Sequence, residues 1–258
     1  MYKVSATKFE NAIALKTSLS EKLGTNLLYA KGCNLDYDLE FEKRVGVFGK
    51  AIQRDGRYDQ ELHQEAMDVA KKADVIVFAI GEAAEMSGEC SSRSDITIPK
   101  AQKDLLEKLS TLNKPIVLVL FTGRPLAITE ESDIANAILN VWFPGTEAGP
   151  AITEVLYGDV NPSGRLPYNY PRYPNSLEKY NRKYTESISE GEQNNDAKYE
   201  KSYLPQFEFG TGLSYTTFGY SNLKIDKTEI NTSDEINVSV DISNTGKKAG
   251  KESVLLYL

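Results

Sequence analysis

Residues 75–80 read VIVFAI and residues 116–121 read IVLVLF, so both runs are apolar at every position. A strand with one face in water alternates apolar and polar side chains, whereas a strand that is apolar throughout is typical of a sheet covered on both faces. Further strands are predicted at residues 27–30 and 137–143. The helical patterns between and beside these strands cover residues 7–24, 60–72, 99–109 and 146–157. This alternation predicts an α/β fold over residues 1–170, with a mainly parallel sheet sandwiched by helices.

The composition changes after this domain. Residues 171–218 begin with a stretch rich in Tyr, Asn, Ser, Lys and Glu without an apolar period, and we interpret them as a linker that closes the α/β domain. Within residues 219–258, apolar side chains at 236, 238, 240 and 242 alternate with polar ones, and another strand is predicted from Val254. That pattern is typical of a β-sandwich, but a sandwich needs about seven strands. We therefore expect the second domain to be truncated.

Composition narrows the function classes. The net charge of −7 and the pI near 5.0 argue against a nucleic-acid partner, which would require clustered basic residues. The apolar runs are too short to span a bilayer, and no signal-peptide pattern follows Met1. Two cysteines, Cys33 and Cys90, and the single His63 supply neither a disulfide framework nor a metal-ligand pattern. We expect no cofactor, no metal and no membrane contact, and a small-molecule substrate.

The loop after residues 75–80 is the strongest candidate for chemistry. It carries Glu82, Glu85, Glu89 and Arg93, and it follows the carboxyl end of a predicted parallel strand, where ligands bind in such sheets. General acid catalysis needs one carboxyl group that is protonated; burial raises a carboxyl pKa and a nearby arginine lowers it. The same loop also fits a solvated acidic surface, and the residues alone do not choose between the two interpretations.

Five blocks of sequence, in this order, resemble glycoside hydrolase family 3, and they cover most of residues 27–258. They are residues 81–99 (GEAAEMSGECSSRSDITIP), 114–126 (KPIVLVLFTGRPL), 142–149 (WFPGTEAG), 158–167 (GDVNPSGRLP) and 209–218 (FGTGLSYTTF). Each block is short, but their order makes the resemblance specific. The whole is most similar to the periplasmic β-glucosidases of the family.

The resemblance implies a retaining β-glycosidase that hydrolyses terminal β-D-glucosyl or related residues. In the family the nucleophile is an Asp on a preceding (β/α) barrel, which this chain lacks, and the general acid/base is a Glu of the second domain. By position Glu89 is that acid/base, with Glu85 in reserve because the length of this loop varies between family members. The two carboxyl groups of a retaining pair lie about 5–5.5 Å apart. We therefore expect this chain alone to be inactive.

Further expectations follow from the resemblance. Arg93 and Trp142 are candidate substrate-binding residues, although Arg93 could instead bond backbone carbonyls and a neighbouring carboxylate, and Trp142 could pack in the core. The first strand of the family's α/β domain is missing here, residues 219–258 correspond to the start of a fibronectin type III-like domain, and a periplasmic or secreted location is implied. A non-catalytic carbohydrate-binding or interaction module is the alternative. The choice among glucoside, xyloside and longer β-glucan substrates is left open.

Overall fold

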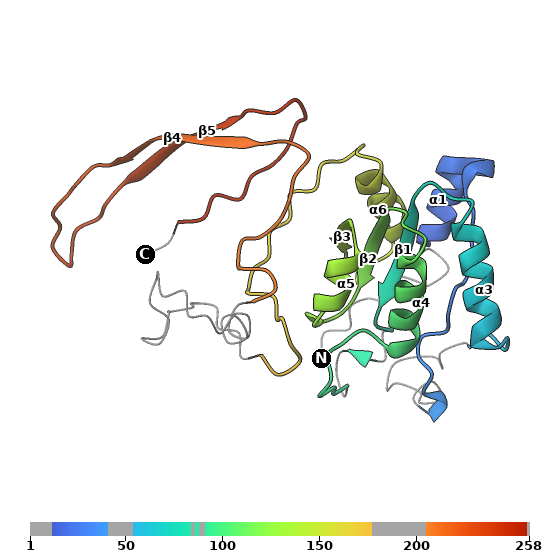
Figure 1. Ribbon diagram of the computed structural model, residues 1–258. Coiled ribbons are helices and arrows are strands. Elements are labelled where there is room, and N and C mark those ends of the chain that lie inside the picture. Colours follow the sequence, from blue (N-terminus) through green and yellow to red (C-terminus); the bar gives the residue numbers. More distant parts are fainter. Residues whose placement is uncertain (1–11, 41–53, 84–85, 88–90, 177–204, 257–258) are drawn as a thin grey trace.

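The computed structural model describes residues 12–40, 54–83, 86–87, 91–176 and 205–256. They form an α/β body from which a two-stranded hairpin projects (Figure 1). The carboxyl-terminal hairpin region contacts the body at residues 158–165, where Lys248 Nζ donates to the Gly158 carbonyl at 2.8 Å and Arg165 pairs with Glu252. The body holds the candidate site.

The sheet of the body is parallel, as predicted. Strands β1 (Ile76–Gly81), β2 (Ile116–Phe121) and β3 (Ala137–Asn140) lie in that order, and Gly81 is paired with Phe121 at the end of the register. The central strand β2 is the most deeply buried, with Val119 fully buried. Residues 116–121 are apolar at every position because both faces of this strand are covered, as predicted.

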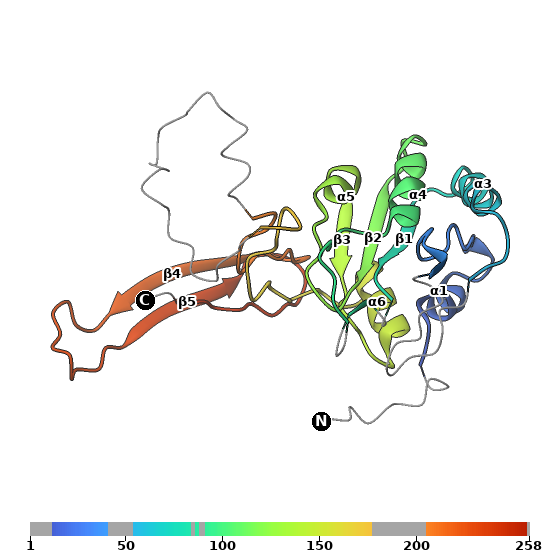
Figure 2. The ribbon, with the colours of Figure 1, turned by 90° about the horizontal axis from the view of Figure 1, so that it is seen from below.

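Helices cover the two faces of the sheet (Figure 2). On one face lie α4 (Lys100–Ser110) and α5 (Thr129–Ile134), and on the other lie α1 (Leu15–Leu23) and α6 (Ala148–Leu156). Helix α3 (Asp59–Ala70) packs beside α4. The short α5 was not expected from the sequence, because six residues give too little of a helical period to recognise.

Helix α4 shows how the apolar pattern builds this core. Ala101, Leu105, Leu106 and Leu109 recur at helical spacing, and each is at most 3% exposed. Pro99 precedes the first helical residue with φ near −54°, a value that its ring enforces and that suits a helix start. Burial of each leucine side chain contributes roughly 1.5–3 kcal/mol.

Two predicted elements differ from the structure. Residues 27–30 form no strand in the described part of the chain, and Leu28 and Tyr29 are exposed. Four residues without a pairing partner do not make a strand, whatever their β propensity. The helix expected at residues 7–24 includes α1, which begins at Leu15; its predicted start lies partly outside the described residues.

The hairpin consists of β4 (Phe218–Ile225) antiparallel to β5 (Val238–Asn244), with a bulge between Ser221 and Lys224. The alternating pattern at residues 236–242 is therefore confirmed as strand through β5, but residues 254–256 form no strand. Large apolar side chains of the hairpin are exposed, as two strands alone cannot bury them. Within the described residues no second sheet packs on the hairpin, so the predicted sandwich itself is not observed.

The segment before the hairpin is bonded to the body. The Tyr170 amide donates to the Phe207 carbonyl at 2.7 Å, and the Leu166 amide donates to the Thr211 carbonyl at 2.9 Å. The Asn161 side chain connects the body to the hairpin region. Its Nδ2 donates to the Ala249 carbonyl at 3.0 Å, and its Oδ1 accepts from the backbone amide of Tyr215. Residues 206–211, in the last part of the predicted linker, are thus bonded to the body.

Candidate active site at the carboxyl edge of the sheet

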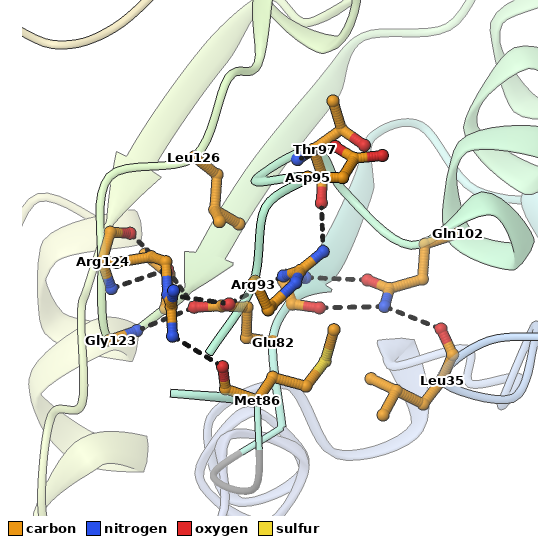
Figure 3. Close-up of polar contacts among 12 residues, drawn as sticks. Leu35, Glu82, Met86, Arg93, Asp95, Thr97, Gln102, Gly123, Arg124 and Leu126 are labelled. Atoms are coloured by element: carbon orange, nitrogen blue, oxygen red, sulfur yellow. Dashed lines mark hydrogen bonds and ion pairs between the residues drawn. The ribbon is translucent and has the colours of Figure 1, made fainter. Parts of the chain in front are cut away.

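Parallel strands end at the same edge of a sheet, so residues that follow β1, β2 and β3 are brought together there. The first of these is Glu82, directly after β1. Its side chain has no exposed surface, and its backbone amide donates to the Phe121 carbonyl at 2.8 Å. The carboxylate therefore points into the protein, toward the loop that follows β2 (Figure 3).

Four groups surround the Glu82 carboxylate. One oxygen, Oε1, accepts a hydrogen bond from Arg93 Nη1 at 2.7 Å and lies 3.4 Å from Arg124 Nε. The other, Oε2, accepts from Thr122 Oγ1 at 2.9 Å and from the Gly123 amide at 3.3 Å. The Arg124 nitrogen is an ion-pair contact without hydrogen-bond geometry. Since removing one partner of a buried ion pair costs about 3–5 kcal/mol, this network fixes the local structure firmly.

Gly81 and Gln102 determine the backbone conformation that directs the Glu82 side chain into this network. Gly81 has φ of +137°, and a Cβ atom there would lie 1.8 Å from the Phe121 carbonyl oxygen, so a glycine is required. The buried Gln102 amide accepts from the Gly81 amide at 2.7 Å and donates to the Gly81 carbonyl at 2.9 Å and the Leu35 carbonyl at 3.0 Å (Figure 3). The backbone of Gly81 is thus held from both sides.

Arg93, a predicted substrate-binding residue, lies in this network. Besides Glu82, its guanidinium donates to the Thr97 carbonyl at 2.9 Å, and its side chain is 17% exposed. These contacts are those of the structural interpretation, an arginine bonded to a carboxylate and a backbone carbonyl. The exposed part of Arg93 borders a cleft of about 370 Å³, whose other walls come from the segment of residues 95–99, from α4, and from Asp36 and Glu130.

Trp142, the other predicted substrate-binding residue, lies at the end of β3 with φ of +53°. Its indole is partly buried against the core and makes an edge-to-face contact with Tyr168, with the ring centroids 6.0 Å apart. The next residue, Phe143, is 53% exposed and its ring lies beside Gly123 and Ser87. At this edge the aromatic surface that faces outward is therefore that of Phe143, which sequence reasoning did not single out.

Glu89 and Glu85, the predicted acid/base and its reserve, lie outside the described residues. The described part of their loop is anchored next to the Glu82 network. Met86 is buried, and its carbonyl accepts a hydrogen bond from Arg124 Nη2 at 2.7 Å. No local sequence pattern indicates this anchor, because it joins residues 38 positions apart.

Among the described residues, no group of three or more His, Cys, Asp or Glu side chains could hold a metal ion. No helix in the same part of the chain has the length and apolar character needed to cross a membrane. His63, buried in α3, has its Nδ1 2.7 Å from Lys108 Nζ, and burial lowers its pKa.

Comparison with known proteins gives a consistent match. The model of the glycosyl hydrolase family 3 C-terminal domain matches residues 3–215. A periplasmic β-glucosidase of Salmonella typhimurium is 40% identical over 91% of this chain and 31% of its own length, and a β-xylosidase of Formosa agariphila is 33% identical over 95% and 31%. The crystal structure of a β-glucosidase from Listeria innocua in complex with isofagomine aligns with a TM-score of 0.70 and 29% identity, over 91% of this chain and 30% of that one. The chain thus spans about a third of the length of these relatives.

Proposed function

The chain belongs to glycosyl hydrolase family 3, and from this premise we propose that it is the carboxy-terminal part of a retaining β-glycosidase. The proposed substrate class is terminal, non-reducing β-D-glucosyl or related residues, because the relatives are named β-glucosidases and β-xylosidases. The proposed location is periplasmic or secreted, after the Salmonella relative. Residues 219–258 are proposed to begin a fibronectin type III-like domain, of which β4 and β5 are two strands.

The proposed role of Glu89 is that of the general acid/base, with Glu85 as the reserve. The observation that carries this proposal is the anchoring of their loop, through Met86 and Arg93, at the carboxyl edge of a parallel sheet. In a retaining mechanism the acid protonates the leaving oxygen while a second carboxylate attacks the anomeric carbon. The deprotonated acid then activates water, which releases the sugar from the enzyme.

The nucleophile is proposed to be an Asp of a (β/α) barrel that precedes this chain in the full-length enzyme. The chain covers only about 31% of the Salmonella relative, which leaves room for such a domain. Because both carboxyl groups are needed, we expect the isolated chain to show no turnover of nitrophenyl β-glucoside. Hydrolysis by the purified chain at a rate typical of glycosidases would contradict the proposal.

The decisive test uses the full-length enzyme. Glu89→Ala should reduce kcat/KM by about 10²–10⁴-fold for substrates whose leaving group needs a proton. For an activated dinitrophenyl glucoside, added azide should restore turnover by attacking the glycosyl-enzyme from the face that the missing carboxylate served. Glu85→Ala is the matched control and should behave as the wild-type enzyme. If Glu85→Ala shows the loss and Glu89→Ala does not, the two assignments exchange.

A carbohydrate-binding module without catalysis is the second candidate function. The half-exposed ring of Phe143 favours it, because aromatic faces stack on sugar rings. In that case Glu89→Ala would leave cleavage by the full-length protein intact and change only the affinity for sugar, which isothermal titration calorimetry measures.

A further inference from the structure

We infer that Glu82 is a positioning residue for the proposed acid/base, because it anchors Met86 and Arg93, which flank Glu89 in the sequence. The inference rests on the proposed function for its catalytic consequence. Its structural basis is independent, because it consists of contacts among described residues. Glu82 itself is not the acid: its side chain has no exposed surface, and both of its oxygens are occupied by donors of the protein.

The Glu82 carboxylate holds the loop at two places. Arg93, ten residues beyond the loop's first residue Ala83, is bonded to Glu82 Oε1 at 2.7 Å. Arg124, from the loop after β2, lies against the same oxygen and donates from Nη2 to the Met86 carbonyl at 2.7 Å (Figure 3). One buried carboxylate therefore orients two guanidinium groups: that of Arg93, which belongs to the loop, and that of Arg124, which donates a hydrogen bond to it.

The two anchors bracket Glu89 closely along the chain. Glu89 is three residues from Met86 and four from Arg93. A chain extends at most about 3.6 Å per residue, so a stretch of three or four residues can span no more than about 14 Å. A shift of either anchor is therefore transmitted over a short distance, and a misplacement of about 1 Å can cost about 100-fold in rate.

The first experiment uses the chain itself. Glu82→Gln keeps the size of the side chain but removes the negative charge that orients both arginines. We expect amide hydrogen exchange to become at least about 10-fold faster at Met86, whose amide donates to Ala83, while amides of β2 such as Val119 stay protected. The matched control is Glu131→Gln, a buried carboxylate of α5 that makes no contact with the loop within the described residues. Unchanged exchange at Met86 in Glu82→Gln would overturn the inference.

The second experiment measures the catalytic consequence in the full-length enzyme. If Glu82 positions the acid, Glu82→Gln should lower kcat/KM by at least about 10-fold for a methyl or alkyl glucoside, whose leaving group must be protonated, and by less than about 3-fold for a dinitrophenyl glucoside. A residue with a merely structural role would reduce the active fraction and lower both values equally. Equal losses would therefore refute the positioning role.

Two further variants keep the test decisive. If Glu82→Gln fails to fold, Arg124→Gln removes the grip on Met86 and leaves the pair of Glu82 with Arg93; it should show the same dependence on the leaving group. Glu89→Ala serves as the reference. If Glu89→Ala shows no leaving-group dependence, the proposed function fails. If Glu89→Ala shows it but neither Glu82→Gln nor Arg124→Gln does, the proposed function stands and the present inference fails.

Discussion

Gly81→Ala is the substitution that probes most directly how the end of β1 directs Glu82. A Cβ atom at this position would lie 1.8 Å from the Phe121 oxygen, 2.7 Å from its carbonyl carbon and 3.0 Å from its nitrogen. These are backbone atoms of the paired strand β2 and cannot rotate away. The ends of β1 and β2 must therefore separate, or Gly81 must leave its φ of +137°.

The expected cost can be worked from these contacts. A non-glycine residue at a positive φ of this kind costs about 1–3 kcal/mol. Separating the strand ends also weakens the hydrogen bonds of Gly81 to Gln102 and of the Glu82 amide to Phe121, each of which contributes about 0.5–1.5 kcal/mol. We expect a loss of about 4 kcal/mol in the free energy of unfolding of the α/β body.

Urea unfolding followed by tryptophan fluorescence measures this loss. The chain has a single tryptophan, Trp142, which packs on Tyr168 next to the affected edge. With a urea dependence of about 2 kcal/mol per M, the midpoint should fall by about 2 M. Gly164→Ala is the control, because no atom lies within 4 Å of a Cβ at that position, and its midpoint should stay within about 0.3 M of the wild type. A shift under about 0.5 M for Gly81→Ala would refute the reasoning.

Three further predictions concern single side chains of the body. Burial raises the pKa of Glu131, and Lys103 opposes this shift. The stability that this group contributes is therefore present below its unfolded pKa and is lost as the pH rises through its folded pKa. Glu131→Gln should stabilise the fold at pH 7 more than at pH 4 in denaturant titrations. Burial, reinforced by Asp59, raises the pKa of Cys33 to about 12. Iodoacetamide at pH 8 should therefore alkylate Cys33 at least about 100-fold more slowly than a free cysteine, because the thiolate is the reactive form. Mass spectrometry of the Cys33 peptide measures this rate, and a rate comparable to that of a free cysteine would contradict the prediction. Tyr170→Phe removes the hydroxyl that accepts from the buried Leu126 amide, and it should lower the free energy of unfolding by about 1–3 kcal/mol. Tyr168→Phe should be neutral, because the Tyr168 hydroxyl has no hydrogen-bond partner within the described residues. Equal shifts of the melting temperature for both variants would contradict the assignment.

The sheet and its main helices could be predicted because their signals are local. Continuous apolar runs identify β1 and β2, and a helical apolar stripe identifies α4, whose observed bounds differ from the prediction by one residue at each end. The strand predicted at residues 27–30 is absent because a strand exists only where another strand pairs with it, and a four-residue window contains no information about pairing. The same reason applies to residues 254–256 in the hairpin region.

The candidate site was only partly accessible from sequence. The loop after β1 could be placed at the carboxyl edge by the rule for parallel sheets, but the choice of Glu89 came from family resemblance, and its role stays a prediction. The Glu82 network could not be foreseen, since it joins Glu82 to Thr122 across 40 positions. Arg93 was noticed, yet nothing in its sequence neighbourhood distinguishes a partner of Glu82 from a partner of sugar.

The backbone pairing of residues 166–170 with residues 206–211 has a consequence for dissecting the molecule. A polypeptide ended at residue 170 would lose that pairing together with Phe207, which packs edge-to-face on the buried ring of Tyr170. A single protease cut between Ser176 and Pro205, by contrast, would leave both partners in place. The two products should then migrate together in gel filtration and separate only in denaturant, so the domain could be reassembled from two halves.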